Sequence, residues 1–448
     1  MKLAKSLLLG SATAFVAVAG ANAADLPSKK AAPVNYVKVC DAYGAGFFNI
    51  PGTETCIKFG GRVRADYAMS GKKDYATAVA GVNIASKSRE NLWGNEARGR
   101  VDLDARTPTA YGTVQAVTSL RLARTSGVLT SSPATAAAGS AAATLEAGYV
   151  RFAGFTFGVA RDNFSFMPSQ LYGAGHWSSF ANGAAQIAYT AVLGGGISGT
   201  LAIQDQSYTT AGATTGTGWA TAATGLANNY DKMPQINARL DWDQSWGSVS
   251  LIGAASQAHL TSSATTATYD KTKTVWALGA GVKVNLPMLA AGDALYLNGG
   301  YADGMTEYTV NWISFKSSDT ARNVGGNVQT AYSYGAGANG VETFKSWNVA
   351  ALFTHFWAPQ WRHTTIATYG QVDAPTTAKA SAWGTTGGGS ADATVWNIGT
   401  QLAFLPTKDF EIGVEALYAR VKLSGSTTAL ANTSQGNWTG RLRVERTF

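Results

Sequence analysis

Arginine recurs at every second position in three short stretches of this chain. The pairs are Arg62 and Arg64, Arg98 and Arg100, and Arg441 and Arg443. Side chains two residues apart point to the same face of a β-strand, so each pair would place two guanidinium groups side by side. Fixed positive charge of this kind sets up a field that acts on nearby ions and water. The carboxylates on the same faces, which could neutralise it locally, are Asp66, Glu96, Asp102, Asp104 and Glu445.

Residue types that would support catalysis or cofactor binding are sparse. The four histidines do not recur at metal-ligand spacing, and no Gly-Lys-Ser/Thr motif is present to cradle a phosphate. No nucleophile, base and orienting group are marked as a set. The formal net charge is +8, but the arginines alternate with apolar residues instead of forming a basic patch. The sequence therefore predicts no enzyme, no metal, no cofactor and no nucleic-acid partner.

The segments that carry the arginines alternate apolar and polar residues, which is the pattern of a strand with two different faces. In residues 57–67, Phe59 and Tyr67 fall on one face and the charged residues fall on the other. Residues 96–106 and 435–448 repeat this design. One face suits hydrocarbon and the other suits water, so a lone strand would be stable in neither. If the first and last strands pair, the sheet between them closes into a barrel without an edge.

Long and short connections alternate between the strand-like runs from residue 56 onward. The eight long ones cover residues 69–93, 124–144, 162–183, 205–232, 260–273, 302–345, 373–393 and 424–435. The seven short turns lie at or near residues 108–112, 154, 194–196, 243–247, 287–293, 358–361 and 406–409. Sixteen strands joined in this way, with the last paired to the first, predict an all-β transmembrane antiparallel β-barrel with long extracellular loops and short periplasmic turns.

The outward faces of the predicted strands are apolar, and many strands carry an aromatic residue near one end. Residues 236–242, for example, place Ile236, Leu240 and Trp242 on one face. Trp and Tyr at strand ends fit the aromatic girdles at the two interfaces of a membrane. A pair of soluble β-sandwiches, with apolar faces packed together, is the alternative. The even strand number and the regular alternation of connections favour the barrel, because sandwiches use Greek-key crossovers.

The N-terminus has the features of a secretory signal peptide. It has a basic start, an apolar run over residues 7–21, and small residues before an expected cleavage after Ala23. A membrane helix is the competing interpretation, but the run is short and interrupted by polar residues. We therefore expect three parts: a signal peptide over residues 1–23, an N-terminal periplasmic segment over residues 24–55, and an outer-membrane barrel over residues 56–448.

Two cysteines, Cys40 and Cys56, lie on either side of an aromatic, glycine-containing segment. In an oxidising periplasm we expect one disulfide, which staples the N-terminal peptide to the foot of the first strand. Two buried free thiols are the alternative. A metal site is not expected here, since no histidine or acidic partner recurs at ligand spacing nearby.

Several segments around these cysteines carry a resemblance to a known family. They are Val39-Cys40-Asp41, Phe47-Phe48-Asn49-Ile50-Pro51-Gly52-Thr53-Glu54-Thr55-Cys56, Gly60-Gly61-Arg62-Val63-Arg64 and the closing Phe448. The chain resembles the major outer-membrane porins of alphaproteobacteria, which are general diffusion porins. The resemblance implies a homotrimer of sixteen-stranded barrels, each with a third long loop folded into its lumen. It also implies passive diffusion of small hydrophilic solutes and ions, with no catalysis and no cofactor.

Such a protein would lie in the bacterial outer membrane. Its expected partners are outer-membrane lipids and lipopolysaccharide, two further copies of the chain, and the barrel-assembly machinery, which would recognise Phe448. A substrate-selective channel for an anion or a sugar is the alternative function.

We expect arginines of neighbouring strands to face each other. The expected pairs are Arg64 with Arg98 and Arg62 with Arg100 in the first hairpin, and Arg98 with Arg121 in the second, if its turn is centred on residues 109–110. Facing like charges destabilise a sheet by up to roughly 1 kcal/mol per pair, so a wall built only for stability would avoid them. Together with Arg441 and Arg443, these residues are candidates for the cationic side of a constriction. Alternatively, neighbouring carboxylates neutralise each arginine, which then only keeps the lumen wet.

The third long connection is richer in aromatic residues than its neighbours. Its candidate constriction residues are Asp162, Phe164, Phe166, Tyr172, His176 and Trp177. Packing against the inner wall would bury the aromatic ones, in agreement with the inward loop that the resemblance implies. Contact with a neighbouring subunit at the trimer axis is the alternative. Asp162 is the only carboxylate of the loop, which argues against a strongly cation-selective opening, and His176 could add positive charge as the pH falls.

Overall fold

The computed structural model describes residues 38–70, 93–129, 140–168, 171–172, 183–205, 226–228, 233–262, 270–310, 334–337, 340–375, 392–424 and 434–448. The expected signal peptide, residues 1–23, and the first part of the expected periplasmic segment lie outside the described residues.

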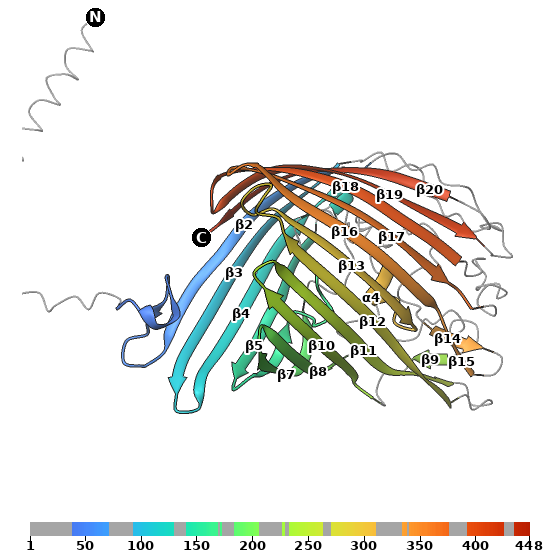
Figure 1. The fold of residues 1–448 in the computed structure, drawn as a ribbon, viewed down its shortest axis with the longest axis horizontal. Coiled ribbons are helices and arrows are strands. Elements are labelled where there is room, and N and C mark those ends of the chain that lie inside the picture. The colour runs from blue at the N-terminus through green and yellow to red at the C-terminus, as the bar shows by residue number, and fades with distance from the viewer. Residues whose placement is uncertain are drawn as a thin grey trace, which may run out of the picture.

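The described residues form one antiparallel sheet of 18 strands (Figure 1). Two of these, β1 (Phe48–Asn49) and β9 (Leu226–Asn228), are short strands at its margins. The other 16 are the strands of a barrel: β2 (Cys56–Ser70), β3 (Trp93–Thr109), β4 (Gly112–Thr125), β5 (Ser140–Phe152), β6 (Phe155–Ala160), β7 (Ala184–Gly194), β8 (Ile197–Gln204), β10 (Gln235–Gln244), β11 (Gly247–Ser262), β12 (Asp270–Asn285), β13 (Ala294–Asp303), β16 (Lys345–Ala358), β17 (Trp361–Asp373), β18 (Asp392–Thr407), β19 (Phe410–Ser424) and β20 (Ser434–Thr447).

The remaining elements are small. β14 (Tyr334–Gly337) and β15 (Gly340–Thr343) form a separate hairpin. The helical segments are η1 (Asp41–Tyr43), η2 (Gly127–Leu129) and α4 (Glu307–Val310). None of the helices in the described part of the chain has the length and hydropathy to cross a bilayer.

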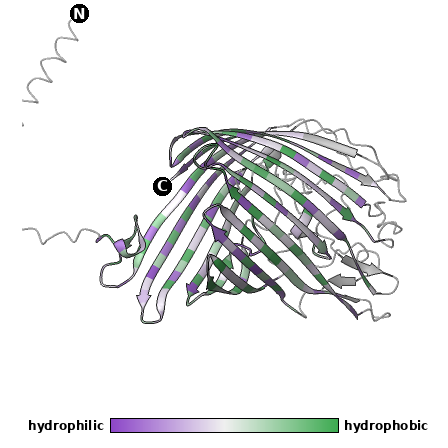
Figure 2. Ribbon diagram, viewed as in Figure 1, coloured by the Kyte–Doolittle hydropathy of each residue, from purple (hydrophilic) through white to green (hydrophobic). Residues whose placement is uncertain are grey.

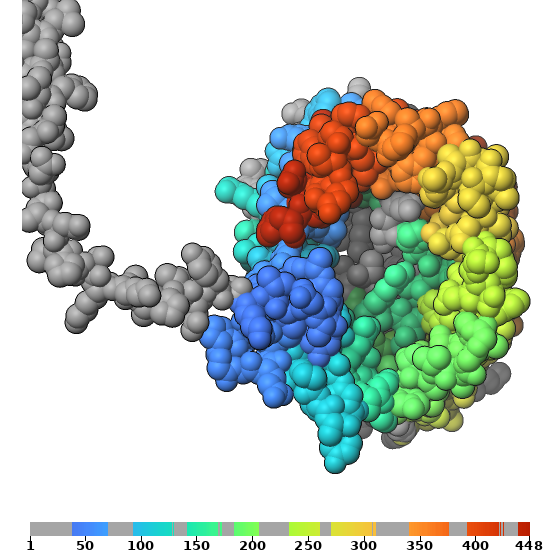
Figure 3. All heavy atoms as spheres, turned by 60° about the vertical axis from the view of Figure 1, so that its left-hand side comes forward, coloured from blue at the N-terminus to red at the C-terminus, as the bar shows by residue number. Residues whose placement is uncertain are grey.

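The last strand pairs with the first, which closes the barrel. β20 lies antiparallel to β2 from the Arg62–Thr447 pair to the Ser70–Thr439 pair. Beyond the first of these pairs, Gly61 and Phe448 exchange two backbone hydrogen bonds of 3.0 and 3.1 Å. Figure 3 shows the chain running from blue to red around a central hollow. The predicted sixteen-stranded barrel is therefore confirmed, and all seven expected short turns join consecutive strands.

Hydrophobic and hydrophilic residues alternate along the strands, as the sequence pattern predicts (Figure 2). Large apolar side chains are exposed on the outside, for example Phe59, Val63 and Leu278. At the ends of the last strands, outward aromatic rings form a row in which the ring centre of Tyr418 lies 5.3 Å from that of Trp396. Because the apolar faces are not packed against another sheet, the sandwich alternative is wrong.

The inner face is not uniformly polar, although the alternating pattern suggested that it would be. On β11 and β12 the inward residues include Ile252, Val275 and Ala277, and all three are buried. They belong to an apolar cluster completed by Phe164 and Tyr308, which come from the connections after β6 and β13. Segments folded inside the barrel therefore cover this part of the wall and remove it from water.

Candidate functional site

The predicted arginines face the lumen from four adjacent strands. β20 and β3 lie on either side of β2, and β4 lies beside β3. On β2, Val63 is exposed on the outside while Arg62 and Arg64 are part-buried inside, as period two requires. We call the following residues the charged wall: Arg62, Arg64, Asp66, Glu96, Arg98, Arg100, Asp102, Arg121, Glu146, Arg441, Arg443 and Glu445.

Arginines of neighbouring strands do face each other within the charged wall. Arg64 lies opposite Arg98 and Arg62 lies opposite Arg100, which is the register expected for the first hairpin. In the second hairpin Arg121 lies opposite Arg100, so the expected pair of Arg98 and Arg121 is wrong. Three arginines from three strands therefore stand at one height: Arg62, Arg100 and Arg121.

The chemistry of the turn between β3 and β4 explains the shift. Thr109 pairs with Gly112, so the turn is centred on residues 110–111, one position later than expected. The Thr109 hydroxyl donates to the Gly112 carbonyl at 2.6 Å and accepts from the Tyr111 N–H at 3.2 Å. Gly112 has a φ of 112°, which few other residues adopt at low cost. A side-chain hydrogen bond and a glycine thus select the register.

Each arginine of the charged wall lies close to a carboxylate. The N···O distances are 2.8 Å for Arg98–Glu96, 2.8 Å for Arg100–Asp102, 3.0 Å for Arg121–Glu146, 3.5 Å for Arg441–Asp66, 2.6 Å for Arg443–Asp66 and 3.9 Å for Arg62–Glu445, and Arg64 also pairs with Glu445. Local pairing thus accompanies every arginine. The charged wall, as the described residues define it, nevertheless holds seven arginines against five carboxylates, and Glu415 opposite Arg441 is a sixth nearby carboxylate, so the net positive charge is small.

The ion pair between Asp66 and Arg443 joins the first strand to the last. Arg443 donates to both carboxylate oxygens, at 2.6 and 2.7 Å, and the two residues are directly opposed in the sheet. Asp66 is only 1% exposed. Bidentate geometry of this kind strengthens a charged hydrogen bond, and a buried carboxylate without its partner would be costly.

Glu146 was not predicted from the sequence as a site residue. It lies in β5 where the pairing with β4 shifts, between the Ser119–Ala147 and Leu120–Leu145 pairs. Such a bulge inserts one extra residue and turns its side chain to a different direction. Glu146 pairs there with Arg100 as well as with Arg121. A lone carboxylate among the small and apolar residues of this strand was the available signal.

Asp104 lies apart from the charged wall, nearer to the turn between β3 and β4. It accepts from Arg106 at 2.7 Å and from the amide of Gln115 at 3.1 Å. This predicted acidic residue therefore neutralises a neighbour on its own strand and not one of the seven predicted arginines.

The first part of the third long connection packs against inward residues of the barrel. Asp162 accepts from the amides of Gln204 and Asn237, at 3.2 and 3.3 Å. Phe164 is 3% exposed and belongs to the apolar cluster on β11 and β12. Phe166 lies beside Tyr296, with ring centres 6.4 Å apart. The three residues hold this segment against the wall.

Arg239 of β10, which was not among the predicted site residues, supports the same segment. Its guanidinium donates to the backbone carbonyls of Asn163 and Ser165, at 3.0 and 2.6 Å, and pairs with Asp241 at 2.7 Å. The Arg-x-Asp spacing on one strand face was the signal that could have found it.

Tyr172 joins the third connection to the charged wall. Its hydroxyl donates to Glu411, its N–H donates to Glu415 at 2.5 Å, and its carbonyl accepts from Arg441 at 2.6 Å. The Arg443 guanidinium lies 4.2 Å from the ring centre, in the geometry of a cation–π contact. Burial, and then the nearby charge of Glu411, raises the pKa of Tyr172, so the phenol stays protonated as a donor. The predicted residues His176 and Trp177 lie outside the described residues.

Cys40 and Cys56 form a disulfide, as expected, with Cα atoms 6.0 Å apart. The two cysteines pack with Phe47 and Tyr43 in a small buried cluster at the foot of β2. The described part of the N-terminal segment therefore lies against the end of the barrel that carries the short turns (Figure 1).

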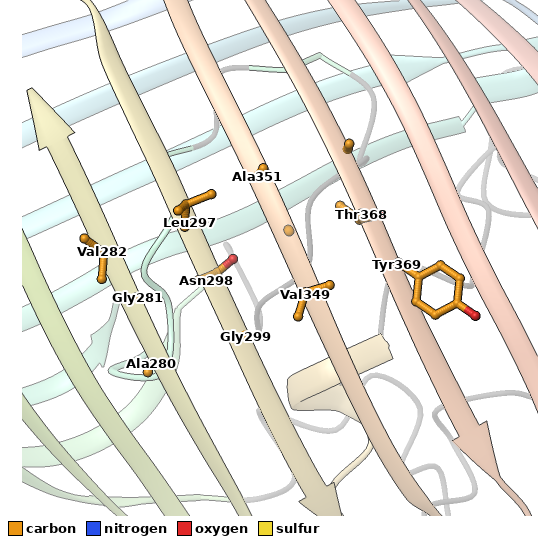
Figure 4. A pocket seen from close by; sticks show the side chains of 12 residues that line it. Ala280, Gly281, Val282, Leu297, Asn298, Gly299, Val349, Ala351, Thr368 and Tyr369 are labelled. Atoms are coloured by element: carbon orange, nitrogen blue, oxygen red, sulfur yellow. The ribbon is translucent and has the colours of Figure 1, made fainter. Parts of the chain in front are cut away.

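An apolar depression lies over β12, β13, β16 and β17 (Figure 4). Small residues such as Ala280, Gly299 and Ala351 alternate there with outward-facing Leu297 and Val349. It opens on the same outward face as Leu278, away from the lumen, so it offers nothing to a hydrophilic solute.

A family profile described as the porin subfamily matches residues 25–440. Porin Omp2b of Brucella suis biovar 1 is 32% identical over 255 residues, which covers 55% of this chain and 64% of that protein. Porin Omp2a of Brucella melitensis biotype 1 is 32% identical over 265 residues, with the same two coverages. The matches thus span a little under two thirds of these relatives.

Among solved structures, the outer membrane channel DcaP of Acinetobacter baumannii superposes with a TM-score of 0.61. Its sequence identity is 16%, and the match covers 90% of this chain and 99% of that one, so it supports the fold. The family match and the lipid-facing exterior place the protein in the bacterial outer membrane. Since the family profile covers nearly the whole sequence, the chain belongs to the porin subfamily.

Proposed function

We propose that the chain forms a water-filled channel for passive diffusion of small hydrophilic solutes and ions across the outer membrane, without catalysis and without a cofactor. The observation that supports this proposal is the closed wall, with apolar side chains outside and part-exposed charged side chains inside. A lumen lined with hydrated charge is a path for ions, whereas the outer face suits hydrocarbon.

Conductance of the refolded protein in a planar lipid bilayer tests this proposal. We expect discrete current steps that grow in proportion to salt concentration, and solute flux that stays linear in solute concentration. Flux that saturates and is blocked by one anion or sugar would favour the substrate-selective channel instead. Protein that is folded in the bilayer but gives no current steps would refute both.

We propose that the charged wall is the cationic side of the constriction and gives the channel a weak preference for anions. The excess of arginines over carboxylates supports this preference, and the ion pair at each arginine limits its size. The third connection would narrow the lumen as the constriction loop, with Asp162 and Tyr172 attaching it to the barrel wall. Reversal potential in a salt gradient measures the preference directly.

We also propose how the chain is divided into parts and which partners it contacts. Residues 1–23 would be removed after Ala23, residues 24–55 would lie in the periplasm, and residues 56–448 would form the barrel. We propose a homotrimer in contact with outer-membrane lipids and lipopolysaccharide, inserted by the barrel-assembly machinery. We propose that this machinery recognises Phe448. N-terminal sequencing of the exported protein and its mass after chemical cross-linking test these assignments.

A further inference from the structure

A second segment folds into the barrel from the long connection that follows β13. Met305, Tyr308 and Val310 are each at most 1% exposed, although this connection was expected to be extracellular. Gly304 starts the inward path with a φ of 79°, and its N–H donates to the Phe344 carbonyl at 2.9 Å. Figure 4 shows the single turn of α4 on the inner side of β13 and β16. We call residues 303–310 the inner segment.

The inner segment contacts the third connection directly. The ring centre of Tyr308 lies 4.3 Å from that of Phe164. The Tyr308 hydroxyl accepts from the amide of Gln235, which also donates to Asn237 at 2.7 Å. Asn237 donates in turn to Asp162, at 3.3 Å. A ring contact and a chain of amides thus connect the two segments into one unit.

The opposite side of the inner segment is fixed to the barrel. The Thr309 hydroxyl shares a hydrogen bond with Ser346, and the Thr309 carbonyl accepts from the amide of Asn348. Both partners are inward residues of β16, and each is only 1% exposed. No passage for water therefore separates the inner segment from the wall at these residues.

The charged wall differs from the wall beneath the inner segment. The side chains of Arg100 and Asp102 are each 29% exposed, so water reaches them. Ser346 and Asn348 also face inward, but the inner segment covers them. Ions need a hydrated path, and the described residues leave one along the charged wall and close it over β16.

We propose that residues 303–310 are a second constriction element, docked on the third connection through Tyr308, which closes one side of the lumen and forces solutes along the charged wall. This inference rests on the proposed channel function and adds which part of the lumen conducts. Tyr308 acts here as a positioning residue, since it holds Phe164 and the inner segment together without touching the solute.

Thiol accessibility tests where the open path lies. Ser346→Cys and Arg100→Cys each introduce one thiol, because Cys40 and Cys56 are bonded to each other. A charged, water-soluble methanethiosulfonate should modify the Arg100→Cys protein in membranes. Modification of the Ser346→Cys protein should be at least roughly tenfold slower, because a buried thiol reacts only when the structure opens locally. Equal rates, or faster reaction at residue 346, would overturn the inference.

Tyr308→Ala should undo the docking. In that background the Ser346→Cys thiol should gain reactivity, single-channel conductance should rise, and larger sugars should pass. Tyr308→Phe keeps the ring contact and loses only the bond to Gln235, so it should give a smaller change and protects the test against misfolding. Tyr369→Ala, which removes a ring of the same type from the outer face, is the matched control. It should leave the thiol reactivity, the conductance and the passage of sugars unchanged.

Two outcomes separate this inference from the channel proposal. If current steps are present but Tyr308→Ala alters neither conductance nor sugar exclusion, the inner segment only stabilises the barrel and the inference fails alone. If no variant conducts and the Arg100→Cys thiol does not react, the water-filled channel fails with it.

Discussion

On the charged wall, inward side chains are held by ion pairs and all but Asp66 and Arg443 remain part-exposed, whereas on β11, β12 and β16 they are held by apolar packing and amide hydrogen bonds and are buried. Both regions belong to the same sheet and follow the same alternation of faces. The difference lies in what covers them: the third connection and the inner segment lie over the second region, whereas on the charged wall Tyr172 covers only the part near Arg441 and Arg443. Strand patterning therefore decides which side chains point inward, and the connections decide which of those meet water.

The largest expected effect comes from breaking the buried ion pair at the closing seam. Asp66→Asn removes the charge that Arg441 and Arg443 share. We expect the free energy of unfolding to fall by roughly 3–5 kcal/mol, because buried cations would lose their counter-charge. Urea titration in lipid vesicles measures it.

Asp104→Asn is the matched control for the seam, since the side chain of its partner Arg106 is 30% exposed. An exposed pair contributes at most about 1 kcal/mol. If both variants lose the same unfolding free energy, burial does not make the ion pair of Asp66 stronger than that of Asp104.

Phe164→Ala tests the covered region. The ring fills the space between β12 and Tyr308, so its removal leaves a cavity and should cost about 3 kcal/mol of unfolding free energy. Phe157→Ala on the outer face, where lipid can fill the space, should cost much less. A similar cost for the two substitutions would contradict the view that this part of the lumen is a packed core.

Gly413→Ala tests how closely the third connection approaches the wall. A Cβ at this inward position would overlap the Tyr172 hydroxyl, so we expect a loss of roughly 1–3 kcal/mol from overpacking. Gly99→Ala adds the same methyl where no atom lies within 4 Å and should be neutral or slightly stabilising. Thermal unfolding of both variants in detergent gives the comparison.

The smallest energetic effect, but the one closest to function, concerns selectivity. Replacing Arg64, Arg98 and Arg121 with Ser should shift the reversal potential toward cation permeability. The free energy of unfolding should fall by less than about 1 kcal/mol per residue, because water and salt screen part-exposed charges. Arg124→Ser, on the same strand as Arg121 but exposed, should leave the potential unchanged. An unaltered permeability ratio in the triple variant would defeat the cationic-constriction proposal.

The barrel itself could be predicted from the sequence, because a period of two is visible in each strand and turn residues separate the strands. The Arg64–Arg98 and Arg62–Arg100 pairs followed from matching Lys58 with Asp104. The partner of Arg121 could not be predicted in this way, because the register between β3 and β4 depends on one hydrogen bond of the Thr109 hydroxyl in the turn. Glu146 was missed because a bulge breaks the alternation on which the prediction relied.

The inner segment could not be predicted for a different reason. Its apolar residues Met305, Tyr308 and Val310 stand at the start of a long connection, and their burial depends on Phe164, which is distant in sequence. The roles of the seven arginines, the five acidic residues and the constriction loop stay predictions. The disulfide between Cys40 and Cys56 is confirmed.

The seam between β2 and β20 also sets an order of assembly. Arg64 and Glu445, which meet there, are 381 residues apart in sequence. Bringing such distant segments together costs chain entropy that no local contact returns, so this contact should form last. Until then the sheet has two open edges that could pair with another chain. The porin therefore becomes safe from aggregation only in the final step of its folding.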